Sequence, residues 1–251
     1  MRLLLVSDIH ANAEALEACL NAAPAYDLAV NLGDVVGYGA SPNQVIERLQ
    51  QLCRLHVRGN HDKACSGVMS AEAFNPIAAW AARWTHEALT PGNLEWLRAL
   101  PAGPLAVPSL DGVQFVHGSP LDEDDYLIGI GDGLQALLGI PVPVTFFGHS
   151  HIQGGFCLYG ERSAEIHPQI ELGCAAESSE MRLNRRVRYL INPGSVGQPR
   201  DGDWRAGFAL FDSDGPTVRF YRVPYDVESA MRRIQDASLP ERLATRLLLG
   251  R

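Results

Sequence analysis

The sequence predicts an α/β fold in which two β-sheets pack face to face inside an outer layer of helices. Over residues 3–57, short apolar runs alternate with segments of helical periodicity, which is typical of a parallel sheet with right-handed crossovers. From Phe156 to Asn192 the pattern changes to short alternating segments separated by turns, which indicates hairpins. No internal repeat or low-complexity linker interrupts the 251 residues, so we expect a single domain over residues 1–251.

The first strands and helices can be assigned in order. Strands are expected at 3–6, 28–32 and 55–57, because each is a continuous apolar run of the kind buried on both faces. Between them, segments 11–22 and 42–52 place their apolar residues on one helical face, and Ser41 followed by Pro42 fits an N-cap and a first helical position. In such sheets ligands bind beyond the carboxyl ends of the strands.

The remaining segments complete the predicted fold. We expect a helix over 75–100 with a break near Pro91-Gly92, hairpins at 104–107 with 112–116 and at 208–211 with 218–223, a strand at 142–147 and a helical tail at 227–249. The second sheet is expected to be the mostly antiparallel C-terminal half. Gly129, Gly131 and Gly133 follow no apolar strand and are assigned to a loop, and the acidic run 122–125 to a solvated loop.

Composition and charge exclude several classes of partner. Apolar residues make up 46% of the chain and charged residues 20%, as in ordinary globular proteins. Acidic residues outnumber basic ones 29 to 21, and the net charge of −8 argues against binding to a nucleic acid backbone. Five scattered cysteines without a CxxC pair fit a reduced compartment, and the apolar N-terminus ends at Asp8, too early for a signal peptide or a membrane span. We therefore expect a cytoplasmic protein with no membrane partner.

Polar side chains with metal-binding chemistry follow the predicted strands. They comprise two carboxylates, one amide and four imidazoles, namely Asp8, His10, Asp34, Asn60, His117, His149 and His151. Mixed oxygen and nitrogen ligands without a thiolate favour Mn, Fe, Zn, Co or Ni over a structural cysteine-type zinc site. Because one ion needs three or four ligands, these seven predict two ions, and a carboxylate such as Asp34 is the natural bridge.

A two-ion site of this kind points to chemistry at phosphorus. Two ions about 3.5–4 Å apart clamp the attacking and leaving oxygens of a phosphoester, and water bridging them loses a proton near neutral pH and becomes the nucleophile. His61 follows Asn60 directly, and an imidazole can donate a proton at neutral pH.

Five motifs in a fixed order carry a family resemblance. They are DxH (Asp8–His10), GDxxxxG (Gly33–Gly39), GNHD (Gly59–Asp62), HG (His117–Gly118) and GHxH (Gly148–His151). Together they resemble the calcineurin-like metallophosphoesterases. The segment Ile191–Asp203, INPGSVGQPRDGD, also resembles the small single-domain bacterial and archaeal members.

The resemblance implies a four-layer α/β-β/α sandwich of two mixed sheets and a dinuclear site. Asp8, His10 and His151 would hold one ion, Asn60, His117 and His149 would hold the second, and Asp34 would bridge the two. His61 would be the proton donor to the leaving oxygen, and Asp62 would orient it.

Two departures from the family pattern bear on substrate and on backbone. The protein phosphatases of the superfamily place a phosphate-gripping arginine just after the bridging aspartate, but Val35–Gly39 contains none. We expect Tyr38 or Arg200 to contact substrate instead. Ala11 stands where glycine is common, and an alanine is tolerated there unless the backbone needs a positive φ.

The expected function is a metal-dependent phosphohydrolase, a phosphodiesterase or phosphomonoesterase, that acts on small phosphoesters such as nucleotides. Mn²⁺ is the ion we expect to support turnover in vitro. A protein phosphatase of the same superfamily and a metal-binding interaction module without turnover are the alternatives. An amidohydrolase barrel would need an HxH pair on its first strand and a metal-bridging lysine later, whereas this chain has Asp8-Ile9-His10 and a single lysine, Lys63. Exposed hairpin edges in the C-terminal half would permit a homodimer.

Overall fold

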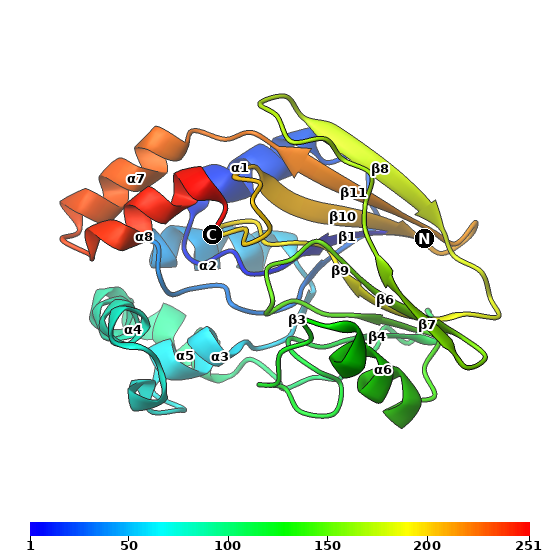
Figure 1. Ribbon diagram of the computed structural model, residues 1–251. Helices are drawn as coiled ribbons and strands as arrows, with labels where there is room; N and C mark the ends of the chain where they lie inside the picture. The colour runs from blue at the N-terminus through cyan, green and yellow to red at the C-terminus, as the bar shows by residue number, and fades with distance from the viewer.

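The predicted α/β architecture is confirmed by the computed structural model, which describes residues 1–251. Two mixed β-sheets pack face to face and helices cover their outer faces (Figure 1). One sheet has six strands in the order β3-β2-β1-β10-β11-β8, and the other has five in the order β4-β5-β9-β6-β7. This arrangement is the four-layer sandwich that the family resemblance implies.

The strands are short and the helices lie mainly in the two ends of the chain. The six-stranded sheet contains β1 (Arg2–Val6), β2 (Leu28–Asn31), β3 (Leu55–His56), β8 (Glu177–Arg182), β10 (Ala206–Asp212) and β11 (Thr217–Val223). The five-stranded sheet contains β4 (Val113–Phe115), β5 (Val144–Phe146), β6 (Gly154–Tyr159), β7 (Arg162–Ile166) and β9 (Arg188–Asn192). The helices are α1 (Ala13–Ala22), α2 (Pro42–Leu52), α3 (Asn60–Ser66), α4 (Pro76–Ala88), α5 (Pro91–Arg98), α6 (Ile130–Gly139), α7 (Val227–Asp236) and α8 (Glu241–Thr245), with 3₁₀ turns η1 (Ala71–Ala73) and η2 (Arg246–Leu249).

The division of strands between the sheets differs from the prediction. β1, β2 and β3 are parallel as expected, but β10 pairs antiparallel with the free edge of β1, and β11 and β8 extend that same sheet. The second sheet is therefore not the C-terminal half alone, since it begins with the parallel strands β4 and β5. Pairing with β10 covers an edge of β1 that would otherwise expose unpaired backbone groups.

Two local predictions are also wrong. Only Leu105 bridges to Phe115, so the hairpin expected at 104–116 is reduced to one bridge, and β4 pairs with β5 instead. The glycines assigned to a loop lie at the start of α6. A Cβ on Gly133 would lie 2.3 Å from the ring of Phe156, so glycine is what allows α6 to approach β6 closely.

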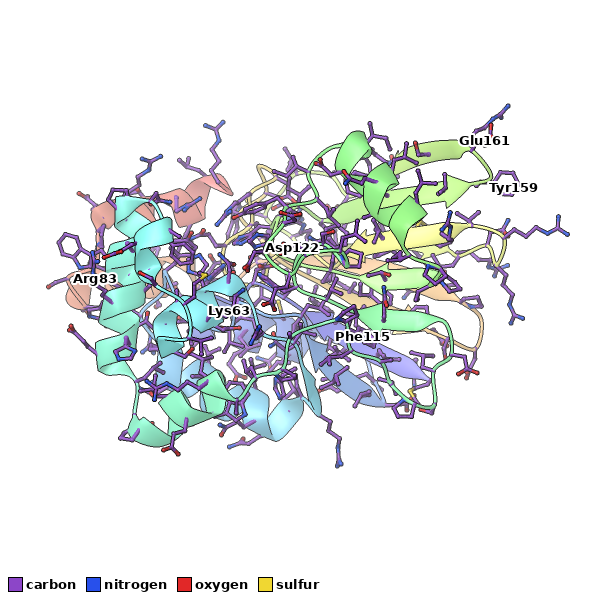
Figure 2. The ribbon with its side chains drawn as sticks, turned by 90° about the horizontal axis from the view of Figure 1, so that it is seen from below. Lys63, Arg83, Phe115, Asp122, Tyr159 and Glu161 are labelled. Carbon is purple, nitrogen blue, oxygen red and sulfur yellow. The ribbon has the colours of Figure 1, made fainter.

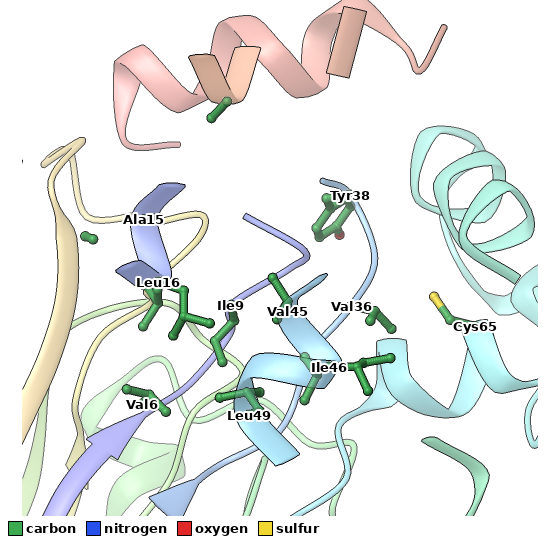
Figure 3. Close-up of a cluster of buried hydrophobic side chains, with 14 of the residues drawn as sticks. Val6, Ile9, Ala15, Leu16, Val36, Tyr38, Val45, Ile46, Leu49 and Cys65 are labelled. Carbon is green, nitrogen blue, oxygen red and sulfur yellow. The ribbon is translucent and has the colours of Figure 1, made fainter. Parts of the chain in front are cut away.

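Three apolar cores hold the four layers together. The largest lies between the six-stranded sheet and its helices, and Figure 3 shows Leu16 of α1 and Val45 of α2 within it. A second core fills the space between the sheets, where the ring of Phe146 lies 5.8 Å from that of Phe115 and 5.2 Å from that of Phe211. A third lies under α6. These cores fix both sheets, so the loops at one end of the sandwich are held at defined positions.

Two further observations complete the description. All five cysteines are free thiols, in agreement with the absence of a disulfide pattern. None of the helices has both the length and the hydrophobicity that crossing a membrane requires.

Candidate metal centre

All seven candidate ligands come together at one end of the sandwich. One ligand atom from each of Asp8, His10, Asp34 and His151 lies within 4.8 Å of the others, and Asp34, His117 and His149 form a second group of the same kind. The amide oxygen of Asn60 lies 3.3 Å from Nε2 of His117, which places it beside the second group. Asp34 belongs to both groups.

Backbone hydrogen bonds between the strand-end loops create this convergence. The amide of Asp8 donates to the carbonyl of Gly33 and that of His10 to the carbonyl of Asp34, both at 3.0 Å, so the loops after β1 and β2 are joined. Across the sandwich, the amide of His149 donates to the carboxylate of Asp8 at 3.1 Å. The loops of the two sheets therefore position each other.

The segment 191–203, which extends the family resemblance, supports the ligands from outside. The hydroxyl of Ser195 donates to the carbonyl of Asp8 at 2.7 Å, and the amide of Gly197 donates to the same carbonyl at 3.0 Å. Nδ1 of His151 lies 2.6 Å from the carbonyl oxygen of Gln198. This segment thus holds ligands from both sheets.

Backbone strain is concentrated in the same loops. Eight non-glycine residues have a positive φ, and seven of them lie at the site: Asp8, His10, Ala11, Asp34, Tyr38, His149 and His151. The left-handed region disfavours residues with a Cβ, and such strain persists only where the surrounding structure imposes it. Its clustering around the ligands indicates that the loop geometry is set by function.

The backbone at Ala11 meets the condition under which we expected glycine to be favoured. Its φ is +52°, so the backbone there lies in the left-handed region that favours glycine. An alanine in that region costs about 1 kcal/mol, which explains why glycine would suit the position better. The amide of Ala11 is held by the carbonyl of Val35 at 2.9 Å, which offsets part of this cost.

Backbone carbonyls determine which nitrogen of each imidazole is protonated and which can bind a metal ion. Nδ1 faces a carbonyl oxygen in three of the histidines: His10 (Val36, 3.1 Å), His117 (Leu32, 2.8 Å) and His151 (Gln198, 2.6 Å). A carbonyl only accepts, so each of these nitrogens carries a proton, and Nε2 is left to face the site. Such hydrogen bonds are the usual support of metal-binding histidines.

The pair formed by His10 and His151 fits a bound cation. Their Nε2 atoms lie 3.2 Å apart. Burial lowers the pKa of both rings well below the ordinary value, so both are neutral and, with Nδ1 protonated, both Nε2 atoms carry lone pairs. Two lone pairs aimed at each other have no hydrogen between them and repel, whereas a metal ion beside them would accept both.

The carboxylate of Asp34 shows the same need for a cation. Its Oδ2 is buried and has no hydrogen-bond donor, although buried polar atoms are normally partnered. It lies 3.6 Å from Nε2 of His10 and 3.5 Å from Nε2 of His117. Burial opposes a charged imidazole, but Asp34 and Asp8 outweigh it and raise the pKa of His117 to about 10. A proton on His117 therefore places a positive charge beside Asp34. The oxygen and nitrogen donors around this position would also suit a transition metal ion.

His149 contacts the acidic run 122–125, which is the solvent-exposed loop that we predicted, with only Glu123 partly buried. Nε2 of His149 lies 3.1 Å from the carbonyl of Asp124, which leaves Nδ1 to face the site. The carboxylate of Asp124 accepts from Lys63 at 2.6 Å, and Glu123 accepts from both Lys63 and Arg58. Lys63 is buried, and Figure 2 labels it and Asp122 in the central part of the view. The carboxylates of Glu123 and Asp124 thus neutralise Lys63 and Arg58.

His61 lies in a tight aromatic environment beside the ligands. Its ring centroid is 4.3 Å from that of Tyr38, 4.6 Å from that of Phe74 and 4.9 Å from that of His10. Its amide donates to the carboxylate of Asp34 at 2.9 Å, while its Nδ1 is buried without a partner. Burial lowers its pKa to about 4, so the ring is neutral at pH 7 unless a bound anion raises that pKa.

Asp62, which the resemblance assigns to orienting His61, makes its hydrogen bonds to backbone amides and none to the ring of His61. Its carboxylate accepts from the backbone amides of Val35 at 2.9 Å, Val36 at 3.3 Å and Gly59 at 2.9 Å. These amides belong to the loop that carries Asp34 and to the turn before Asn60. Asp62 therefore joins the loop that carries Asp34 to the turn before Asn60.

Tyr38 and Arg200, the two predicted substrate contacts, both lie beside the metal centre. Arg246, which we did not predict from the sequence, lies with them. The guanidinium carbon of Arg200 is 5.9 Å from the ring centroid of Tyr38, and that of Arg246 is 5.7 Å from it. Phe74, and Tyr126 with its ring 3.7 Å from that of His149, were also missed. No motif surrounds these three residues, so the sequence carried no signal for them.

This fold and site define a class of protein, and comparison with known proteins identifies it. A family model described as the calcineurin-like phosphoesterase superfamily domain matches residues 1–215. The chain belongs to this superfamily.

Individual relatives cover the whole chain. It is 36% identical to an uncharacterized protein of Methanocaldococcus jannaschii over 251 residues, which covers 98% of this chain and 97% of the relative. The crystal structure of a metallophosphoesterase from Sphaerobacter thermophilus superposes with a TM-score of 0.82 at 35% identity and covers 100% of this chain and 99% of that one. A hypothetical protein from Pyrococcus horikoshii gives a TM-score of 0.76 at 20% identity, with 100% and 98% covered, and shares the fold.

Gly59 offers a test of how tightly the site is built. A Cβ at this position would lie 2.1 Å from Oδ1 of Asp34, although the backbone φ of −103° is open to any residue. We expect Gly59→Ala to displace Asp34, to lower bound metal per chain and to lower the melting temperature. Gly131→Ala is the control, since nothing lies within 4 Å of a Cβ there. Full metal content in Gly59→Ala, measured by elemental analysis, would show that Asp34 is free to move.

Proposed function

We propose that this protein is a dinuclear metal-dependent phosphohydrolase of small phosphoesters. The proposal rests mainly on one observation. The unprotonated Nε2 atoms of His10 and His151 lie 3.2 Å apart, next to Oδ2 of Asp34, which has no hydrogen-bond partner. Membership of the calcineurin-like phosphoesterase superfamily supports the reaction class.

Each ligand has a place in this proposal. Asp8, His10 and His151 would hold one ion, and Asn60, His117 and His149 the second, with Asp34 shared by both groups as its position allows. Two such ions supply Lewis-acid stabilisation of charge on the phosphoryl oxygens and acidify water at the site. Mn²⁺ is the ion proposed for activity in vitro, and Fe, Zn, Ni or Co suit the same donors.

The protein's own contribution to proton transfer would come from His61. Its ring is clamped by Tyr38 and Phe74, so its orientation is fixed before substrate arrives. Because burial lowers its pKa to about 4, it can act as an acid only when the negative charge of bound phosphoester raises that pKa. The proton would then pass from His61 to the leaving oxygen.

The proposed substrates are small phosphoesters, with nucleotides as the first candidates. The segment Val35–Gly39 lacks the arginine that grips phosphate in protein phosphatases, and the net charge of −8 disfavours nucleic acids. The complete ligand set argues against an interaction module without turnover. Cytoplasmic location and homodimer formation remain predictions from the sequence.

Metal-dependent turnover tests the proposed function directly. After removal of metal with a chelator, the protein should not hydrolyse bis-p-nitrophenyl phosphate, and added Mn²⁺ should restore hydrolysis. Elemental analysis of the active protein should give about two ions per chain, as a two-metal site requires. Two bound ions with no turnover on any phosphoester would instead support the interaction module.

Asp34→Asn tests the shared carboxylate. Removing its charge should weaken metal binding in both groups, because Oδ2 lies 3.6 Å from His10 and 3.5 Å from His117. Asp236→Asn, at an exposed position of α7, is the matched control. If Asp34→Asn retains two full equivalents of metal by elemental analysis, the sharing of Asp34 is wrong.

His61→Ala tests the proton donor. It should lower kcat by roughly 10²–10⁴ on esters with poor leaving groups, as loss of a general acid does, and by much less on p-nitrophenyl esters. The control is His167→Ala, an exposed histidine whose ring pairs with Glu165. Equal losses on both classes of ester would count against proton donation by His61.

A further inference from the structure

Different segments of the chain contact the two groups of candidate ligands. Segment 191–203 holds Asp8 and His151, which belong to the first group. The stretch from Gly118 to Tyr126, here called loop 118–126, lies between β4 and α6 and contacts His149 of the second group instead. We therefore asked what holds this loop against the second group.

The loop starts directly after one ligand of the second group and returns to another. Gly118 follows His117, and a Cβ on Gly118 would lie 2.5 Å from the carbonyl oxygen of Glu123, so glycine is what lets the loop fold back this closely. The returning chain places the carbonyl oxygen of Asp124 at 3.1 Å from Nε2 of His149. Two ligands of the second group are therefore connected through the loop.

His149 needs the opposite tautomer from the other candidate ligands. In His10, His117 and His151 a backbone carbonyl faces Nδ1, so Nε2 is left to bind an ion. In His149 a carbonyl faces Nε2, which must carry the proton because a carbonyl only accepts, and Nδ1 is left instead. This is the one hydrogen bond that the ring makes. The position of Asp124 therefore selects the nitrogen of His149 that can bind a metal ion.

Lys63 holds Asp124 in this position. Its amine donates to both carboxylate oxygens of Asp124 at 2.6 Å and to Glu123 at 3.0 Å, and Arg58 donates twice to Glu123, at 2.6 and 3.0 Å. The side chain of Lys63 is only 7% exposed, although that of Asp124 is 46% exposed. An isolated surface ion pair contributes little, whereas a network with a bidentate arginine keeps a defined geometry.

The same lysine belongs to the helix that begins with the third ligand of the second group. Lys63 lies in the first turn of α3 after Asn60, whose amide oxygen is 3.3 Å from Nε2 of His117. Figure 2 labels Lys63 on α3 and Asp122 on the loop, both in the central part of the view. The ion pair between Lys63 and Asp124 thus ties α3 to the loop, although its amine donates to no candidate metal ligand.

We infer that Lys63 is a positioning residue for the second ion only. Through Asp124 it holds the ring of His149 with Nδ1 free, and the ion beside His10 and His151 does not need it. This inference rests on the proposed function, because it assumes that the site takes two ions. Hydrogen-bond partners that orient metal-binding histidines typically contribute a factor of about 10 to 100 to metal affinity.

Calorimetric titration of the metal-free protein with Mn²⁺ tests the role of Lys63. The unmodified protein should bind two ions. Lys63→Met, which keeps an apolar side chain of similar length, should bind one ion with an affinity within about twofold of normal and the other about 10- to 100-fold more weakly. Lys63→Arg keeps the charge and should restore part of the loss. Anomalous diffraction from Lys63→Met at limiting Mn²⁺ should show the retained ion beside His10 and His151.

Asp124→Ala shows whether Lys63 acts through Asp124. This variant keeps the backbone carbonyl and leaves Lys63 paired with Glu123, so it removes the tie without leaving a buried cation unpaired. It should weaken the second ion about as much as Lys63→Met does, and the double variant should bind that ion no more weakly than either single variant. Because Asp124 is half exposed, this variant carries the test even if Lys63→Met does not fold.

Arg48→Met is the control for loss of a paired cation. Arg48 lies on α2 and donates to Glu17 of α1 at 2.7 Å, so this variant removes an ion pair between two outer helices and should bind both ions normally. Equal weakening of both ions in Lys63→Met would reveal a general loss of stability and would overturn the inference. Two ions bound with full affinity in Asp124→Ala would overturn it as well.

Failure of the proposed function is seen separately, because binding is measured without turnover. If the unmodified protein binds two Mn²⁺ ions but hydrolyses no phosphoester, the function fails while the titrations still decide the role of Lys63. If it hydrolyses phosphoesters and Lys63→Met keeps both ions at full affinity, the function stands and this inference is lost.

Discussion

The structure depends on one buried carboxylate, that of Asp34. Its Oδ1 accepts the amide of His61, and its Oδ2 lies without a donor between His10 and His117. A buried anion of this kind is stable only where positive charge is brought to it. The ligand loops of both sheets converge on this requirement, and the helices that follow them carry the residues that surround it.

The strained loops start from strand ends that the apolar core between the two sheets holds in place. Seven residues at the site adopt left-handed backbone conformations that would not persist in isolated loops. The core between the sheets, built around the stacked Phe115 and Phe146, fixes the strand ends from which those loops start. Hydrogen bonds such as that from Ser195 to the carbonyl of Asp8 then join the loops across the sandwich. The packed core and these hydrogen bonds together fix the positions of the ligands at the end of the sandwich.

The sequence predicted the fold class and the meeting of the ligands because both follow from local pattern. Apolar runs define strands, and parallel strands that end in polar motifs bring those motifs to one edge, as Asp8 and Asn60 show. What it could not predict depends on tertiary contacts. The carbonyls that select each imidazole nitrogen have no side-chain signature, and Arg246 reaches Tyr38 only because the tail folds back over the site. We did not predict that β10 pairs with β1, because strand pairing between distant segments gives no periodic pattern in the sequence.

We propose that the two ligand groups hold two ions that share Asp34. Anomalous X-ray diffraction from crystals grown with Mn²⁺ tests this most directly, because it locates the ions independently of any activity. We predict two peaks per chain, about 3.5–4 Å apart, one beside His10 and His151 and the other beside His117 and Asn60. A single peak, or two peaks too far apart for one carboxylate to reach both, would contradict the account.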